Sequence, residues 1–386
     1  MPAWLASQGL DAYAIATYLS IVVLPWVFKL FTGPMMDRFQ YPAMGQRRPW
    51  VLGAQFGMTS SLCLLTLVDD PMHQIGLLTA IAVIVNVFAA TQDVAVDGMA
   101  IDLVPDSEYG RVNAFMSCGK AVGWAASAAV SGALLVTAGL GITALLGACV
   151  SAGVFLLFLG IRERAGERIL PWTAGQATAS PGTSRSVGSV VRSLNGVLWT
   201  RTSAVVFLVV FFYGLINGYG DALMPIAAIN LFEFTTEEWS GLVASMGLIG
   251  AFLALGIGPL IDRFGVKRIS MLTIGLVGAH ALLLALTEFL WVNDFYVQTM
   301  LSVWVLLDPV SMVCVIAIAM SICTQGVSAT QFAVYMSAAN LGASSGSKLY
   351  AIVSQQADFV QSYFLLAALL AFTLCILAMF RRPTRA

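Results

Sequence analysis

Charged side chains inside long apolar stretches are the residues of this sequence best suited to chemistry. Asp93 and Asp97 stand four positions apart, so on a helix they share one face, with Gln92 beside them. At 1.5 Å per residue, Lys29, Lys120 and Asp93 each lie roughly 12 to 14 Å from the polar end of their own stretch. Two carboxylates and two ammonium groups at one depth predict a hydrated site for an anionic solute, with a carboxylate as proton carrier. Mutual neutralisation that only holds helices together is the alternative interpretation.

A second set of ionisable residues lies further along the chain. Asp221 and Lys348 each lie roughly 27 Å from the arginine-rich end of their stretch. We expect them to pair near the opposite surface, or Lys348 to extend to the lipid headgroups instead. Asp308, next to Pro309, lies nearer the middle, and we expect it to line a cavity where a helix breaks. His280 is interpreted as a satisfied interior residue.

Catalysis and metal binding find little support in the residue pattern. The segment GASSG at 342–346 matches a nucleophile motif only formally, since that motif needs a strand-to-helix turn and this segment lies in an apolar run. Close helix packing explains its small residues better. The chain has two histidines and six cysteines without paired spacing, so we expect no enzyme, cofactor or metal site. No basic cluster suggests nucleic acid, whereas a membrane sensor without transport remains an open alternative.

The elements that carry these residues are membrane-spanning helices. Of the 386 residues, 59% are hydrophobic and 10% are charged, far fewer charges than in a soluble domain. A bilayer core requires roughly 20 apolar residues per helix, and the runs are too long and continuous for barrel strands. We therefore predict an all-α integral membrane protein with about eleven spans. They lie near 12–36, 49–68, 75–100, 111–137, 142–161, 203–231, 240–260, 269–289, 297–323, 330–353 and 359–380.

The positive charges predict the orientation of these spans. Sixteen of the nineteen lysines and arginines fall in alternate loops and in the C-terminal tail, whereas the opposite loops carry acidic residues and no Lys or Arg. Cytoplasmic loops are enriched in Lys and Arg. We therefore predict a multi-pass protein whose C-terminus is cytoplasmic.

An internal repeat divides the chain into two pseudo-symmetric halves. GPMMDRF at 33–39 and GPLIDRF at 258–264 are identical at five of seven positions. We predict an N-terminal half at 1–161 with five spans, a cytoplasmic linker at 162–201, and a C-terminal half at 202–386 with six spans. In such repeats the site lies between the halves. One span precedes the second motif copy without a counterpart before the first copy. We therefore expect the first helix of the repeat to be missing, through either a misassigned start or a true truncation.

At these motifs the chain resembles the major facilitator superfamily, whose loop signature is G-x-x-x-D-R-x-G-R. The segments LPWVFKLFTGPMMDRF, GQRRPW, ATQDVAVDGMAIDLVP and SATQFAVYMSAANLG are similar to the AmpG-type permeases and their acetyl-CoA-transporter relatives. The matching loop residues are Gly33, Asp37 and Arg38 in the first copy and Gly258, Asp262 and Arg263 in the second.

The resemblance implies the major facilitator fold and secondary active transport by alternating access. It implies a proton-coupled, monomeric permease of the bacterial inner membrane. An anhydromuropeptide is the expected solute, and acetyl-CoA or a siderophore is the alternative. The Asp–Arg pairs of the loop motifs are expected to hold one access state, unless they merely turn the chain.

Overall fold

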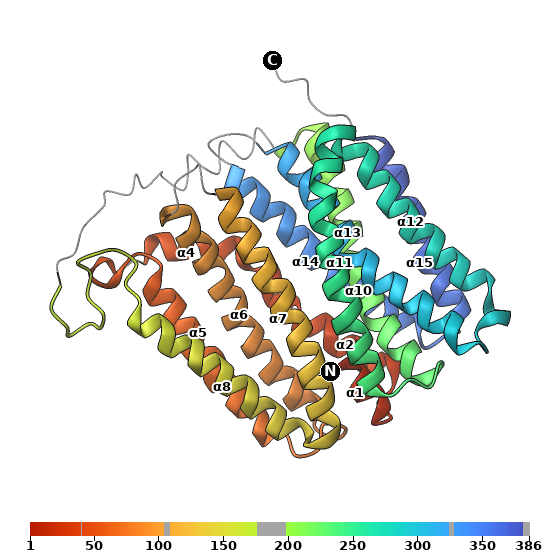
Figure 1. The fold of residues 1–386 in the computed structure, drawn as a ribbon, viewed down its shortest axis with the longest axis horizontal. Coiled ribbons are helices and arrows are strands. Elements are labelled where there is room, and N and C mark those ends of the chain that lie inside the picture. Colours follow the sequence, from red (N-terminus) through yellow and green to blue (C-terminus); the bar gives the residue numbers. More distant parts are fainter. Residues whose placement is uncertain (40, 104–108, 176–197, 324–327, 381–386) are drawn as a thin grey trace. The chain divides into compact units, whose positions relative to one another are not determined.

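The structure is a computed structural model that describes residues 1–39, 41–103, 109–175, 198–323 and 328–380 (Figure 1). Nearly all of these residues are helical. In chain order the helices are α1 (Pro2–Ser7), α2 (Ala12–Val22), α3 (Leu24–Val27), α4 (Lys29–Arg38), η1 (Pro42–Met44), α5 (Arg48–Leu64), η2 (Leu65–Leu67), α6 (Ile75–Leu103), α7 (Tyr109–Thr137), α8 (Gly139–Gly160), α10 (Arg201–Asn230), α11 (Thr236–Phe264), α12 (Val266–Leu286), η4 (Glu288–Leu290), α13 (Asp294–Ser321), α14 (Ser328–Val353) and α15 (Phe359–Ala378).

Ten helical segments among the described residues are long and apolar enough to cross a membrane. They correspond to ten of the eleven predicted spans, which confirms the all-α integral membrane class. The remaining predicted span, 330–353, is helix α14, which is more polar because it contains Ser, Thr, Gln, Asn and Lys side chains. Each predicted span therefore has a helical counterpart.

The chain divides into two compact units, which we describe separately. Unit 1 contains residues 1–21, 118–137 and 193–386, and unit 2 contains residues 22–117 and 138–192. The division into halves at 1–161 and 202–386 remains a prediction, since the compact units follow contacts and not repeat boundaries.

In unit 1, α10 packs against α14 along small residues. A Cβ atom added to Gly218 of α10 would collide with the Ala343 carbonyl of α14, and one added to Gly346 of α14 would collide with the Leu215 carbonyl of α10. Ser347 Oγ also donates to the Gly218 carbonyl oxygen at 2.9 Å. Small residues let helix backbones approach closely in a membrane. The GASSG segment therefore serves helix packing, as its sequence context predicts.

In unit 1, α12 also lies beside α15 and α11 beside α13 (Figure 1). Of the second ionisable set, Asp221 lies on α10, His280 on α12, Asp308 on α13 and Lys348 on α14.

In unit 2, α6 is the helix against which α3, α4 and α5 pack. The first predicted span is interrupted twice, at Val23 and at Phe28, so that α3 and α4 are separate helical segments. Pro25 contributes to this interruption because its ring nitrogen cannot donate to the preceding turn. Lys29 is consequently the first residue of α4.

Two charged residues of unit 2 tie the chain after α8 to the start of α5. The Arg48 guanidinium, only 1% exposed, donates to the carbonyl oxygens of Phe158, Leu159 and Ile169. Glu163 Oε2 accepts from the main-chain N–H of Arg48 at 3.0 Å. The carboxylate thus caps the positive end of α5, while Arg48 satisfies the last carbonyls of α8. The first part of the predicted linker is therefore bonded to unit 2.

Candidate functional site

Lys29 and Asp93 form an ion pair between α4 and α6 in unit 2. The Lys29 ammonium donates to Asp93 Oδ2, and each side chain is 19% exposed. The ammonium also lies 4.3 Å from the centre of the Trp26 ring. Trp26 is held in turn by Asn86, whose Oδ1 accepts from the indole Nε1 at 2.7 Å. The partial exposure leaves the pair accessible to a solute or a proton.

The position of Lys29 on α4 explains why its positive charge needs a carboxylate nearby. Lys29 stands at the N-terminal end of α4, where the helix dipole is positive. A second positive charge is unfavourable there unless an anion offsets it. Asp93 supplies that anion from α6, ten residues or about 15 Å before the helix ends at Leu103.

The other members of the predicted cluster are distributed over both units. Gln92 and Asp97 are partly buried on α6, near the ion pair in the sequence. The Arg47 side chain lies against Gly98, because a Cβ on that glycine would be 3.0 Å from Arg47 Nε. Lys120 is exposed on α7 in the portion that belongs to unit 1. Its predicted membership of the cluster therefore remains a prediction.

Asp308 is surrounded by polar groups of α10 in unit 1. It lies near the middle of α13, roughly 20 Å from either end. Asn217 Nδ2 donates to Asp308 Oδ1 at 3.2 Å, and the Tyr213 hydroxyl donates to the Asp308 carbonyl oxygen at 3.5 Å. Asp221, one turn beyond Asn217, lies close enough to interact electrostatically with Asp308. The side chains of both aspartates are exposed.

The predicted helix break beside Asp308 is wrong. Helix α13 continues through Pro309 without interruption. A proline inside a helix removes one main-chain hydrogen bond, and the adjacent turns can preserve the helical path. The lone histidine of this region, His280, is buried and interacts with the Met300 main chain, as expected of a satisfied interior residue.

Lys348 is placed beside α2 of the same unit and not beside Asp221. Its ammonium donates to the Tyr13 hydroxyl and to Thr17 Oγ1, both at 3.3 Å. It also lies 4.7 Å from the centre of the Tyr13 ring. The structure therefore does not bring Lys348 to Asp221, because the two side chains leave their helices in different directions.

The loop-motif residues are described only in part. The side chains of Asp37, Arg38 and Asp262 lie outside the described residues. Gly33 and Gly258 lie within α4 and α11, and a Cβ at either would meet no atom within 4 Å. The exposed Arg263 guanidinium lies 5.3 Å from the centre of the Phe264 ring. The predicted closing role of both motifs stays a prediction.

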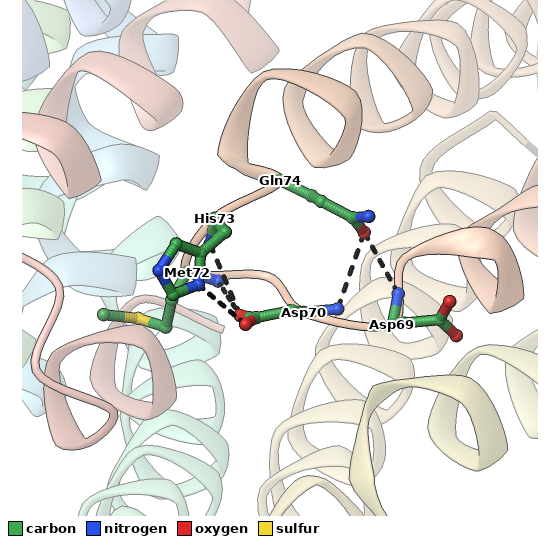
Figure 2. Close-up of polar contacts among 5 residues, drawn as sticks. All are labelled: Asp69, Asp70, Met72, His73 and Gln74. Carbon is green, nitrogen blue, oxygen red and sulfur yellow. Dashed lines mark hydrogen bonds and ion pairs between the residues drawn. The ribbon is translucent and has the colours of Figure 1, made fainter.

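The loop between η2 and α6 is organised by hydrogen bonds among neighbouring residues (Figure 2). Asp70 Oδ2 lies 2.7 Å from His73 Nδ1, and Asp70 Oδ1 accepts from the main-chain N–H of Met72 at 3.0 Å. Gln74 Oε1 accepts from the main-chain N–H of Asp69 at 3.1 Å. The His73 side chain, and then its main-chain N–H, lower the pKa of Asp70 below its ordinary value. These contacts make a local turn.

Sequence reasoning missed Trp26, Asn217 and Ser311. Helical spacing could have found the first two, since Trp26 lies three residues before Lys29 and Asn217 four residues before Asp221. A lone serine in an apolar span carries no such signal. Charged side chains thus lie within helices that are long and apolar enough to cross a membrane, where they can bind an ion or a charged solute.

Comparisons with known proteins indicate that this chain is similar to membrane transporters. The family model described as Major Facilitator Superfamily matches residues 1–347. The anhydromuropeptide permease of Escherichia coli (strain K12) is 25% identical over 356 residues, which cover 89% of this chain and 67% of the permease. An uncharacterized protein of Haemophilus influenzae is 32% identical over 113 residues, which cover 29% of this chain and 26% of that protein. The chain thus spans about two thirds of one relative and about a quarter of the other.

Two solved structures share the fold. The inward-open xylose transporter XylE from E. coli has a TM-score of 0.72 at 13% identity, covering 99% of this chain and 90% of XylE. The nucleoside transporter NupG has a TM-score of 0.70 at 13% identity, covering 99% of this chain and 96% of NupG. At this identity the likeness shows the fold alone.

Proposed function

The chain belongs to the major facilitator superfamily, and from that membership we propose that it imports a bulky anionic or amphiphilic solute by proton-coupled alternating access. An anhydromuropeptide is the proposed solute. The transporter is a multi-pass membrane protein, and we expect it in a bacterial inner membrane, as a monomer, acting without catalysis.

The observation that carries this proposal is the similarity to the E. coli anhydromuropeptide permease over 356 residues. The similar region covers 89% of this chain, so it is not confined to one hydrophobic segment. The uncharacterized H. influenzae relative gives no substrate information.

The geometry of unit 2 supports an anionic solute. The Lys29 ammonium lies at the positive end of the α4 helix dipole. The ammonium and the dipole both attract an anion that reaches this depth. An anion that competes for Lys29 weakens the hold on Asp93. A weaker attraction to Lys29 makes protonation of Asp93 more favourable, because an ionised carboxylate is costly inside a membrane. Solute arrival and proton uptake are then linked, which is the requirement for symport.

The test is uptake of labelled anhydromuropeptide by proteoliposomes that contain the full chain. An inward proton gradient is expected to give accumulation above equilibrium, whereas a collapsed gradient gives equilibration only. Unlabelled acetyl-CoA and a siderophore are added as competitors to test the alternative solutes. Chemical analysis of the recovered label excludes or detects an enzymatic conversion.

The Asp93→Asn and Asp97→Asn variants examine the coupling step. Each is expected to abolish gradient-driven accumulation, and one of them should retain exchange down a solute gradient. Asp69→Asn, in the outer loop, is the matched control because it removes one carboxylate far from α6's charged face. Accumulation with unchanged pH dependence in both membrane variants would leave the cluster with a structural role only.

A further inference from the structure

The carboxylates of Asp308 and Asp221 lack a cationic partner among the residues that the structure describes. The described ion pairs involve neither residue. Asn217 neutralises no charge, although it donates to Asp308 Oδ1 and leaves Oδ2 for a ligand. Two neighbouring carboxylates inside a membrane are costly unless a positive charge reaches them.

Ser311 provides an independent sign that a ligand is missing. It lies three residues after Asp308 on α13 and is 4% exposed. Its buried Oγ has no hydrogen-bond partner. A buried hydroxyl without a partner is uncommon and often marks the place of a water or an ion.

Asp308 and Ser311 line one cavity of about 20 Å³. That volume holds about one water molecule and excludes any transported solute. Tyr213 and Asn217 of α10 also line it, so oxygen atoms come from two helices. The walls contributed by α12 and α15 are Ile274, Val277, Leu370 and Thr373, which do not titrate.

We propose that this cavity binds one small monovalent cation, Na⁺ or hydronium. Asp308 Oδ2 and Ser311 Oγ are its ligands, Asn217 orients the carboxylate, and Asp221 adds negative potential. A divalent ion is a poor fit, because Ca²⁺ and Mg²⁺ require six or more oxygens and usually several carboxylates at ligand distance. The exposed part of Asp308 gives the ion a way in.

This inference rests on the proposed function, because the cation site would couple an ion gradient to a conformational change in unit 1. The ligands and their supports come from α10 and α13, so an occupied site stabilises the contact between these helices. An ion that binds one conformation of these helices more tightly shifts the transport cycle toward that conformation. The titratable groups near Asp308 are Asp221 and Tyr213 on α10 and Cys314 on α13, and all three are treated in the test below.

The first arm measures radioactive sodium binding to the purified full chain in detergent, with choline as the replacement cation and no solute present. Saturable binding is expected, and Asp308→Asn should weaken it at least tenfold. Asp294→Asn is the matched control, because it makes the same change at the exposed end of the same helix. It should bind sodium as the unaltered protein does.

The second arm detects a bound proton by infrared spectroscopy in sodium-free choline buffer near neutral pH. If hydronium is the ligand, it transfers its proton to the Asp308 carboxylate and leaves water, so a protonated carboxyl band is present. That band disappears in Asp308→Asn but not in Asp294→Asn. The variants Asp221→Asn, Tyr213→Phe and Cys314→Ser assign the signal among the neighbouring groups. Absence of both sodium binding and an Asp308-dependent band overturns the proposal.

A third measurement uses Ser311→Ala, which changes no charge. If the hydroxyl ligates an ion, this variant should bind the cation several-fold more weakly and lose the thermal stabilisation that the cation gives. If the hydroxyl has no ligand, alanine removes a buried orphan polar group and raises the unfolding temperature under all conditions. The second result would overturn the proposal. Because no arm involves transport, failure of the ion site is distinguishable from failure of the transport function.

Discussion

The Lys29 ammonium experiences one attractive and one repulsive electrostatic interaction. The carboxylate of Asp93 attracts the ammonium, whereas the positive end of α4 repels it. The Trp26 ring adds a cation–π contact that orients the side chain without neutralising it. An arriving anion would therefore compete with Asp93 for this ammonium.

Replacing Lys29 by glutamine should therefore weaken binding of an anionic solute about tenfold, equivalent to roughly 1.4 kcal/mol. Binding of a neutral analogue should change much less, because glutamine keeps a hydrogen-bond donor. The measurement is titration calorimetry of the purified variants with both compounds. Lys267→Gln serves as control, since that ammonium bonds the carbonyls of Ala378 and Phe380 at the end of α15. An equal loss for both solutes would argue against charge recognition at Lys29.

Asp70 allows a prediction on pH, since its hydrogen bonds with His73 and Met72 lower its pKa. A carboxyl with a depressed pKa stabilises the folded turn above its unfolded value, near 3.8, and loses that stabilisation as pH falls through the lower folded value. Hydrogen exchange of the Met72 amide should therefore stay slow down to pH values below the ordinary Asp range. Asp70→Ala should speed that exchange several-fold at neutral pH, while Asp69→Ala should not.

Helix arithmetic locates a residue along the membrane normal but not around the helix axis. It predicts one depth for Lys29 and Asp93, and the structure pairs the two side chains. It cannot choose a partner for Lys348, which contacts Thr17 on α2, whereas Asp221 interacts with Asp308. Which face of a helix meets which neighbour depends on packing, and the sequence of one helix does not contain that information.

Contacts between segments far apart in the chain could not be predicted from the sequence either. Glu163 and Arg48 are 115 residues apart, and nothing in either segment indicates that a carboxylate will cap α5. By contrast, GASSG could be assigned to packing because a nucleophile turn is incompatible with a long apolar helix. Local pattern thus predicts the elements and some of their surfaces, whereas long-range polar contacts require coordinates.

The contact of α10 with α14 depends on the absence of side chains at four glycines, two on each helix. Gly346→Val would drive methyl groups into the Leu215 carbonyl and force the helices apart. We expect a loss of roughly 1 to 3 kcal/mol or more in stability, the usual range for overpacking. The midpoint of thermal unfolding in detergent measures it.

Gly256→Val in α11 is the matched control for that substitution. A Cβ at Gly256 meets nothing within 4 Å, so the variant should unfold close to the unaltered protein. Comparable destabilisation of both variants would mean that valine itself, and not the close approach of α10 and α14, is the cause.

At the scale of the whole molecule, the charge distribution predicts which side of the membrane each loop faces. Sixteen of nineteen lysines and arginines lie in or at the edges of alternate loops and in the C-terminal tail. One of these loops contains the segment that Arg48 and Glu163 bond to unit 2. Inserting a basic loop through a membrane against its preferred side is unfavourable, so orientation follows Lys and Arg and not net charge. The net charge of −1 accordingly carries no orientation signal.

We therefore expect the C-terminus in the cytoplasm and the Asp69–Gln74 loop outside. Alkaline phosphatase, which is active only outside the cytoplasm, should be active when inserted at His73 and inactive when fused after Ala386. Green fluorescent protein should give the opposite pattern. The exposure of His73 makes its loop a tolerant insertion site, since the side chain is 86% exposed. Phosphatase activity at both positions would contradict the odd number of spans between them, because the loop and the tail would then lie on the same side.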